Sequence, residues 1–223
     1  GVIDFLYGEE CDGSSMSYAS CAEMGLEGEG LSCSADCHVD TSGCQVGFLQ
    51  MCSGIDFSCA IKLDNTVQCW GINNYSKCDA PEGIAFDFIS CGYSHTCGIT
   101  TSGEAHCWGT NHAGESDVPD GALFSHISAG HNLTCGITTE QKALCWGNNS
   151  NGQVDVPDNN FLDIATSDYN TCGIVEGNSL VCWGVDGALT DNPPPGNDFV
   201  RMGTSRFGVI NLCAIKSDHS ARC

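Results

Sequence analysis

The sequence predicts an all-β repeat protein in which small three-stranded sheets stack on one another. A pair of cysteines separated by nine residues occurs five times, and in four copies Trp-Gly follows the second Cys. These four tryptophans recur every 37 or 38 residues, a period typical of repeat architectures. Long apolar stretches with the helical period are absent. A sheet of this size cannot bury both of its faces alone, so neighbouring repeats must cover it.

Residues 1–44 differ from the repeats that follow. They contain five cysteines, many Gly and Ser residues and few large apolar side chains. A segment of this composition cannot build a core of its own and depends on disulfides. The sequence therefore predicts two parts, a disulfide-rich N-terminal module over residues 1–44 and the repeats over residues 45–223.

Each repeat begins with a predicted inner strand, marked by a Phe and by an apolar residue three positions later. The pairs are Phe48/Met51, Phe86/Ile89, Phe124/Ile127, Phe161/Ile164 and Phe199/Met202. A β-hairpin, a polar loop rich in Asn and a Pro complete the repeat. The predicted blades span 45–81, 82–119, 120–157 and 158–194, and 195–223 is a partial copy.

The hairpin is clearest in the segment Cys97–Gly109. Thr101-Ser102-Gly103 is a turn in which Gly takes positive φ, and β-branched or aromatic residues flank it. Folding about Ser102 places Cys97 opposite Cys107, close enough to bridge. Closing so short a loop stabilises the fold by roughly 2–3 kcal/mol. We expect a disulfide in every copy: Cys59–Cys69, Cys97–Cys107, Cys135–Cys145, Cys172–Cys182 and Cys213–Cys223.

The tryptophans that follow the hairpins are predicted to form a structural core. Aromatic residues fixed to a repeat period usually serve the repeat's own packing, so we expect burial between blades, against the hairpin disulfides. The alternative is a row that binds carbohydrate or another ligand. The residues are Trp70, Trp108, Trp146 and Trp183.

Three cysteines, Cys52, Cys78 and Cys91, fall outside the hairpin pattern. We favour a Cys78–Cys91 pair, with Cys52 joined to the N-terminal module. With the five N-terminal cysteines they make eight, which allow 105 connectivities, so the pairing stays open. The eight residues are Cys11, Cys21, Cys33, Cys37, Cys44, Cys52, Cys78 and Cys91.

Composition places the chain in an oxidising compartment and excludes several partners. The 18 cysteines are about 8% of the residues, near the level of disulfide scaffolds. Only 7 Lys and Arg oppose 28 Asp and Glu, a net charge of −21. This balance argues against nucleic acid, whose binding needs phosphate neutralisation, and against anionic membranes. No apolar run approaches the ~20 residues that span a bilayer. An extracellular or cell-surface location follows.

Cofactor and metal sites built on cysteine or histidine are disfavoured. Cys33 and Cys37 precede His38 as in c-type haem attachment, but three residues intervene instead of two, so a disulfide is the preferred interpretation. Zinc needs thiolates, and the hairpins consume ten cysteines. The other histidines share no repeat position, which predicts surface or turn roles. They are His95, His106, His112, His126, His131 and His219.

Carboxylates that flank the repeat prolines are predicted to form a solvated acidic rim. Calcium is the alternative ligand, because hard cations prefer carboxylate and carbonyl oxygens. No nucleophile elbow or His-Glu-x-x-His motif is present, so we predict no catalytic residues and no cofactor. Asn74, Asn132 and Asn148 fit the N-glycosylation pattern. The carboxylates are Asp117, Asp120, Asp155, Asp158, Asp191 and Asp198.

The repeats resemble a known family over Gly92–Gly109 and Gly130–Gly147, where Gly-x-x-x-Thr-Cys-Gly-Ile, a Gly-containing turn and Cys-Trp-Gly recur. This pattern resembles the regulator of chromosome condensation repeat, and its short period looks closer to bacterial secreted versions, such as the β-lactamase inhibitor protein II type. The resemblance implies a β-propeller, most often with seven blades. The chain has about five repeats, which predicts an open or incomplete ring.

The segment Gly8–Cys44 resembles cysteine-rich repeats of secreted and surface proteins of deltaproteobacterial type. That resemblance implies an extracellular stalk or spacer. The usual opening Cys, just before a stretch like Gly1–Asp4, is missing here.

Together these features predict a non-enzymatic secreted or cell-surface protein with a structural or adhesive role, such as a filament or appendage subunit. The alternative is a specific protein-binding module or secreted inhibitor, with aromatic and polar side chains on one rim. A nucleotide-exchange role, as in intracellular relatives, is disfavoured by the disulfides and acidity. The last repeat stops at Cys223 and leaves a Trp site empty, so we expect further copies or more of the same polypeptide as partners.

Overall fold

The computed structural model describes residues 47–185, 193–204 and 212–222, and six two-residue strands between residues 11 and 45. The chain divides into two compact units, Gly1–Phe48 and Leu49–Cys223. In the first unit the short strands pair as β1 with β2, β3 with β6 and β4 with β5. Their bounds are β1 Cys11–Asp12, β2 Ser15–Met16, β3 Glu27–Gly28, β4 Ser32–Cys33, β5 Val39–Asp40 and β6 Cys44–Gln45.

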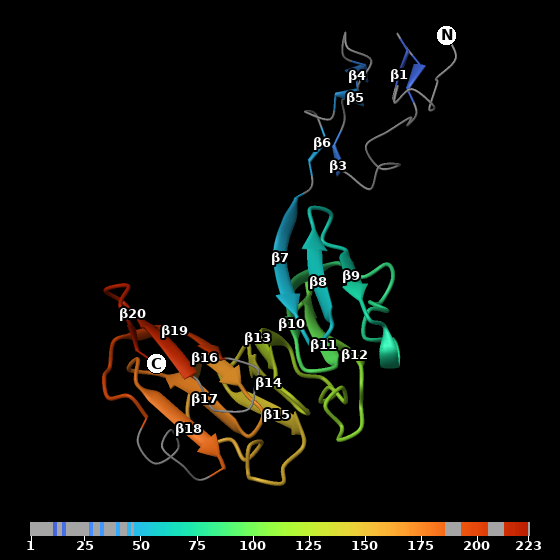
Figure 1. Ribbon diagram of the computed structural model, residues 1–223. Helices are drawn as coiled ribbons and strands as arrows, with labels where there is room; N and C mark the ends of the chain where they lie inside the picture. The colour runs from blue at the N-terminus through green and yellow to red at the C-terminus, as the bar shows by residue number, and fades with distance from the viewer. Residues whose placement is uncertain are drawn as a thin grey trace. The chain divides into compact units, whose positions relative to one another are not determined.

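The second unit consists of three-stranded antiparallel sheets, each made of consecutive strands. We call them blades 1 to 5 (Figure 1). Blade 1 is β7 Phe48–Ser53, β8 Phe57–Lys62 and β9 Val67–Gly71; blade 2 is β10 Phe86–Cys91, β11 His95–Thr100 and β12 Ala105–Gly109; blade 3 is β13 Phe124–Ala129, β14 Leu133–Thr138 and β15 Ala143–Gly147; blade 4 is β16 Phe161–Thr166, β17 Asn170–Val175 and β18 Leu180–Gly184; blade 5 is β19 Phe199–Thr204, β20 Leu212–Lys216 and β21 Ala221–Arg222.

This architecture confirms the predicted all-β class and blade repeat. The helical content of the described residues is one short 3₁₀ turn, Asn74–Ser76. The blades follow one another in chain order along an arc, with blade 1 and blade 5 at its ends (Figure 1). Each sheet is separate, so among the described residues no strand ladder closes the ring.

The hairpins have the predicted register. In blade 2, Cys97 lies opposite Cys107 and Thr96 opposite Trp108, because the turn around Ser102 closes the strands without a register shift. Disulfides join the first four pairs with Cα atoms 4.0 Å apart: Cys59–Cys69, Cys97–Cys107, Cys135–Cys145 and Cys172–Cys182. Cys213 is also disulfide-bonded, and Cys223 lies outside the described residues.

The interpretation of Cys52, Cys78 and Cys91 was wrong. Cys52 is bonded to Cys91, with Cα atoms 5.5 Å apart, so this disulfide joins the inner strands of blades 1 and 2. Cys78 is the free cysteine of the described residues, and burial raises the pKa of its thiol. The sequence could not reveal the Cys52–Cys91 pairing, because that pairing depends on how neighbouring blades align in space.

Hydrophobic layers between consecutive blades form the core. The layer between blades 2 and 3 contains Cys97 and Ile99 of one blade and Phe124, Ile127 and Trp146 of the next. The layers before and after it repeat this arrangement. Each buried Trp therefore packs on the hairpin disulfide of the preceding blade.

Trp108, Trp146 and Trp183 are buried, but Trp70 is 40% exposed, so the prediction of a fourth core Trp was wrong. Trp70 belongs to blade 1, the first three-stranded sheet of the described residues. Met51 of the same blade is exposed as well, whereas its counterparts Ile89 and Ile127 are buried.

Two glycines explain why the repeat keeps its short motifs. A Cβ added at Gly98 would lie 2.5 Å from the Phe86 ring, so Gly lets the inner-strand Phe pack flat on the hairpin. Gly109, which ends Cys-Trp-Gly, has φ +101, and a Cβ there would lie 2.6 Å from Ser94 O. The third strand can therefore turn only with Gly at this position.

Candidate functional site

Two sets of loops gather on one face of the blades. One set joins the first and second strands, as Gly92–Ser94 does, and the other follows the third strand. Thr110 N donates to Ser94 O at 2.9 Å, and Asn148 N donates to Asn132 O at 2.8 Å, which ties the two sets together. We call this the loop face. It comprises residues 54–56, 72–79, 92–94, 110–117, 130–132, 148–155 and 167–169. The opposite face carries the hairpin turns and is called the turn face.

The outer loops of this face are fixed by a recurring Asn–Asp clamp. Asn111 Nδ2 donates to Asp117 Oδ1 at 2.7 Å, and Asn111 Oδ1 accepts from Ser116 N at 3.0 Å. The pairs Asn73–Asp79 and Asn149–Asp155 repeat the carboxylate contact at 2.7 and 2.8 Å. Such bonds pre-organise the loops, since their polar groups are satisfied locally.

Four of the carboxylates that were predicted to form an acidic rim make specific contacts with other side chains. Asp117 and Asp155 belong to the clamps, while Asp158 and Asp198 each lie 3.0 Å from a lysine, Lys142 or Lys216. Asp120 is exposed, and Asp191 lies outside the described residues. Within the described ranges no three His, Cys, Asp or Glu side chains form a metal-binding group.

In the outer loops that follow blades 1 to 3, a buried polar residue anchors the loop seven positions after the Trp. Lys77 Nζ donates to Ile55 O at 2.9 Å and lies over the Phe57 ring. Glu115 Oε2 accepts from Ala113 N at 2.7 Å, and Gln153 Oε1 accepts from Asn151 N at 2.8 Å. The repeat therefore uses three different side chains for one positioning task.

In blade 2 this anchor joins a buried network that leads to blade 3. Thr134 Oγ1 and Trp146 Nε1 both donate to Glu115 O, at 2.8 and 2.9 Å. Because the Thr134 hydroxyl proton is used there, His95 Nε2 must carry a proton and donate to Thr134 Oγ1 at 2.8 Å. His95 is fully buried, so the predicted surface or turn role was wrong for this residue.

Glu115 remains ionised in this network. Burial alone would raise the pKa of its carboxyl. Backbone N–H donors, among them Ala113, and the charge of His95 lower the pKa by more, so it lies below its usual value. The charge is thus held inside the loop and is not presented to solvent.

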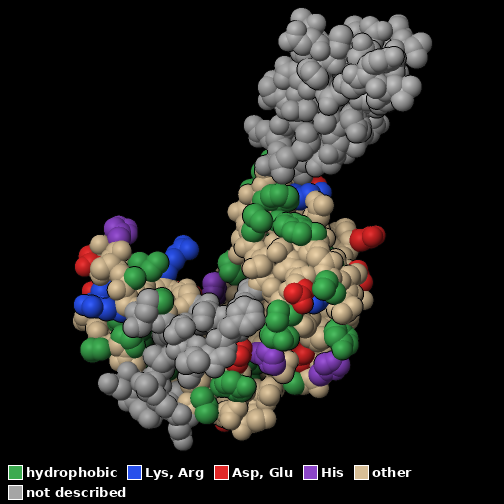
Figure 2. Space-filling model, in the orientation of Figure 1, with side chains coloured by type: hydrophobic (Ala, Val, Ile, Leu, Met, Phe, Trp, Pro, Cys, Tyr) green, Lys and Arg blue, Asp and Glu red, His purple; other side chains and the backbone are tan. Residues whose placement is uncertain are grey.

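Aromatic and histidine side chains pair across blades on the loop face. The ring centroids of Tyr93 and His131 lie 4.2 Å apart, and those of Tyr75 and His112 lie 5.4 Å apart, both edge-on. Tyr75, Ile72 and Tyr169 are at least half exposed. Figure 2 shows histidine and hydrophobic side chains side by side at the lower end of the blades. We use the name aromatic rim for six residues of the loop face: Ile72, Tyr75, Tyr93, His112, His131 and Tyr169.

Sequence reasoning missed these pairs because it compared histidines only with one another. Tyr93 and His131 occupy equivalent positions in blades 2 and 3, each directly after the Gly that follows the inner strand. Comparison of all residue types at that position would have found an aromatic or polar ring in consecutive repeats. The remaining histidines, His106 and His219, lie on β12 and in the last hairpin turn.

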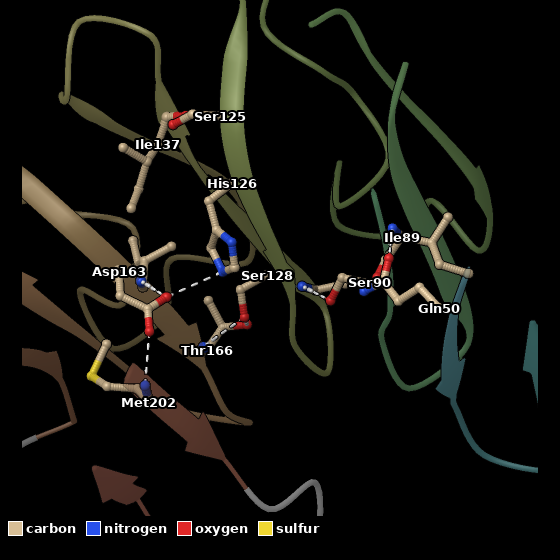
Figure 3. Close-up of polar contacts among 12 residues, drawn as sticks. Gln50, Ile89, Ser90, Ser125, His126, Ser128, Ile137, Asp163, Thr166 and Met202 are labelled. Atoms are coloured by element: carbon tan, nitrogen blue, oxygen red, sulfur yellow. Dashed lines mark hydrogen bonds and ion pairs between the residues drawn. The ribbon is translucent and has the colours of Figure 1, made fainter. Parts of the chain in front are cut away.

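The inner strands carry a polar ladder that is structural (Figure 3). Ala129 N donates to Ser90 Oγ and Thr166 N to Ser128 Oγ, both at 3.0 Å. Met202 N donates to Asp163 Oδ2 at 2.7 Å. In each case a side chain of one blade satisfies an edge amide of the next, which a three-stranded sheet leaves open. The Cys52–Cys91 disulfide occupies the equivalent of the Ser90–Ala129 contact.

His126 extends this ladder, with Nε2 3.3 Å from Asp163 Oδ1 (Figure 3). Burial lowers the pKa of His126, and the charge of Arg201 lowers it further. The carboxylate of Asp163 raises the pKa by less, so the pKa lies below its usual value of 6.5. The neutral imidazole is therefore the stable form in the folded protein.

This shift predicts a loss of stability in mild acid. The unfolded chain takes up the His126 proton more readily, so unfolding becomes easier as the pH falls through 6.5 toward the folded pKa. His126→Gln removes this titration. Urea unfolding between about pH 7 and about pH 5.5 should show a steeper loss for the natural chain than for His126→Gln. Equal slopes would contradict the assignment.

The remaining sequence candidates are placed as follows. Asn74 is exposed, whereas Asn132 and Asn148 are half-buried. The Cys33-x-x-x-Cys37-His38 segment lies outside the described residues, apart from the backbone of Cys33 in β4. No helix in the described part of the chain is long and apolar enough to cross a membrane.

Comparison with known proteins bears on the blades. The model of the Regulator of chromosome condensation (RCC1) repeat matches residues 48–76, 86–115 and 124–153. The chain carries RCC1-type repeats. The matched stretches cover the strands of blades 1 to 3 and the first part of each outer loop that follows them. No curated protein matches the chain.

Two solved ectodomain structures are similar to this chain. The ectodomain of the Physcomitrella patens receptor kinase CR4 is 33% identical, with a TM-score of 0.54 over 62% of this chain and 39% of that one. The CRINKLY WD40 ectodomain of the Arabidopsis thaliana receptor kinase ACR4 is 32% identical, with a TM-score of 0.52 over 61% and 49%. The chain thus spans less than half of either ectodomain.

A third structure, Prp20p from Saccharomyces cerevisiae, is 13% identical, with a TM-score of 0.56 over 66% of this chain and 47% of that one. At this identity the likeness concerns the fold alone. The RCC1-type fold of the blades is therefore supported by the repeat match and by these structures.

Proposed function

We propose that this chain is a non-enzymatic protein-binding module of an extracellular or cell-surface protein, and that the loop face binds the partner. The aromatic rim is the observation that carries this proposal. Tyrosine and other aromatic side chains are enriched in protein interfaces and their hot spots. Here Tyr75 projects from a clamped outer loop, and Tyr93 and Tyr169 project from the short loops between the first and second strands. Loops on a rigid scaffold are the usual location of binding residues.

Two findings support the extracellular assignment. Disulfides staple the hairpins and one pair of inner strands, and such bonds persist in oxidising compartments. The two plant structures at 32% and 33% identity are receptor-kinase ectodomains. Prp20p, similar in fold, has binding properties to Gsp1p and histones, which is in keeping with a protein partner.

The contacts of the polar candidates favour binding over catalysis. Asp117 and Asp155 hold loops in shape, and Glu115 and His95 are fully buried beneath a loop. Each of these side chains holds a loop in place. A catalytic side chain would instead have to reach a substrate and exchange a proton with it. A secreted inhibitor of β-lactamase inhibitor protein II type is the special case in which the bound partner is an enzyme.

A filament or appendage subunit is the second candidate, favoured by blade 1. Met51 is 59% exposed on β7, whereas the equivalent Ile89 of blade 2 is buried. Exposed apolar surface recruits partners, and head-to-tail contact between copies would give open filaments. Met51→Asp should then reduce self-association in sedimentation experiments.

The binding proposal predicts that the aromatic rim, and not the turn face, retains the partner. The test compares Tyr75→Ala/Tyr169→Ala with the matched control Leu63→Ala/Leu123→Ala, four side chains that are all exposed. Each immobilised variant is incubated with the secreted and surface proteins of the source organism. We expect the rim variant to lose proteins that the natural chain and control retain, because interface aromatics dominate binding energy. Equal recovery by both variants would contradict the proposal.

A further inference from the structure

We propose that blade 5 of one copy of the chain stacks on blade 1 of a second copy, and that this contact repeats the packing between consecutive blades. The inference rests on the self-association described above as the second candidate function, and it does not involve the loop face. Blades 1 and 5 lie at the two ends of the arc (Figure 1). The proposed partner of each end is the opposite end of another copy.

Consecutive blades meet through two complementary halves. One half is the hairpin of the earlier blade, which contributes Cys97 and Ile99 to the layer between blades 2 and 3. The other half is the inner strand and the Trp of the later blade, which contribute Ile127 and Trp146 to the same layer. None of these four side chains is more than 7% exposed. A blade between two neighbours therefore buries a hairpin half on one side and an inner-strand half on the other.

The two ends of the arc expose opposite halves of such a layer. On blade 1, Met51 and Trp70 belong to the inner-strand half and are 59% and 40% exposed. On blade 5, Ile215 has the hairpin position that Ile99 has in blade 2, and it is 42% exposed. Stacking blade 5 on blade 1 removes these apolar side chains from water, as the interior layers do. Each end thus supplies the half that complements the other.

A backbone hydrogen bond accompanies the packing of consecutive blades, and blade 5 has the conformation of its acceptor. The first residue of an inner strand donates to a hairpin-turn carbonyl of the blade before it. Phe124 N donates to Gly103 O at 2.7 Å, and the bond between blades 4 and 5 ends on Asn178 O at 3.1 Å. These accepting residues have positive φ, +88 in Gly103 and +62 in Asn178. His219 has the equivalent place in the blade 5 turn and a φ of +66, so this turn is shaped to receive a further inner strand.

The distribution of charge along the sequence favours contact between opposite ends over contact between like ends. Residues 1–44, which precede blade 1, contain nine Asp and Glu and no Lys or Arg, a charge of −9. The blade 5 repeat, residues 195–223, contains four basic and two acidic side chains, a charge of +2. Opposite charges attract the two ends, whereas two acidic ends repel each other. The side chains of this repeat are Arg201, Arg206, Lys216 and Arg222 against Asp198 and Asp218.

Sedimentation velocity of the full chain and two variants tests the proposal. At about 0.15 M salt, repulsion between charges more than about 8 Å apart is largely screened. We expect the natural chain of 23.4 kDa to form oligomers that grow with concentration. Met51→Asp alters only the blade 1 end and Ile215→Asp only the blade 5 end. Each variant alone should be monomeric, with association weakened at least about tenfold, because a charge enters an apolar layer.

An equimolar mixture of the two variants is the decisive sample. It contains one intact blade 5 end, on Met51→Asp, and one intact blade 1 end, on Ile215→Asp. The mixture should therefore form a dimer and nothing larger. Leu123→Asp is the matched control, because it adds the same charge at a turn-face side chain that is 45% exposed. It should assemble like the natural chain, and circular dichroism checks that every variant is folded.

A natural chain that stays monomeric at all concentrations overturns the proposal. So does a mixture that stays monomeric, or assembly that Met51→Asp abolishes and Ile215→Asp does not, since the contact is then not head to tail. None of these variants alters the aromatic rim. Failure of assembly therefore leaves protein capture by the loop face intact, and loss of captured proteins by Tyr75→Ala/Tyr169→Ala leaves assembly intact, so the two failures are distinguishable.

Discussion

Replacing Trp146 by Ala is expected to lower the free energy of unfolding by about 3–5 kcal/mol, the usual cost of removing a buried large aromatic side chain. Trp146 is buried between blades 2 and 3, its ring lies 5.8 Å from that of Phe124, and its Nε1 donates to Glu115 O. The substitution leaves a cavity against the Cys97–Cys107 hairpin and removes a bond that fixes the outer loop of blade 2.

Trp70→Ala is the matched control for this result. Trp70 has the same place in the repeat but is 40% exposed, so the same substitution should cost less than about 2 kcal/mol. Chemical unfolding followed by circular dichroism measures both. Equal losses would contradict the view that each Trp packs on the blade before it.

Removing the Cys52–Cys91 disulfide is expected to cost up to about 4 kcal/mol, because it closes a loop of about 40 residues in the unfolded chain. It also links the inner strands of blades 1 and 2. At the equivalent position, blades 3 and 4 are joined instead by a hydrogen bond from Thr166 N to Ser128 Oγ. The variant is Cys52→Ala/Cys91→Ala, measured by urea unfolding against the natural chain.

Cys52→Ser/Cys91→Thr is a sharper comparison, since it copies the Ser128–Thr166 pair. We expect it to recover about 1 kcal/mol relative to the double Ala variant, the net contribution of one hydrogen bond. If the double Ala variant unfolds like the natural chain, the disulfide does not join the two blades in solution.

The blade and its hairpin could be predicted because their information is local. The turn around Ser102 fixes which residues face each other, so Cys97 opposite Cys107 followed from spacing alone. The Phe and Ile of the inner strand likewise marked a buried face, as Phe124 and Ile127 show.

Contacts between blades could not be predicted from local patterns. The Cys52–Cys91 bond, the exposure of Trp70 and the burial of His95 all depend on which blade lies next to which. The aromatic rim has the same origin, because Tyr93 meets His131 only once two blades are aligned. A repeat motif describes one blade, whereas the candidate site is formed by side chains of different blades that lie next to each other.

Zero-length carbodiimide cross-linking of the chain to its captured partner, mapped by mass spectrometry, tests the central claim most directly. The reagent joins carboxylates to amines, and each face of the blades offers exposed carboxylates. Our account predicts that partner lysines are joined to loop-face residues Asp56, Asp79, Asp117 or Asp155. Cross-links confined to Glu104 and Glu140 of the turn face would contradict it.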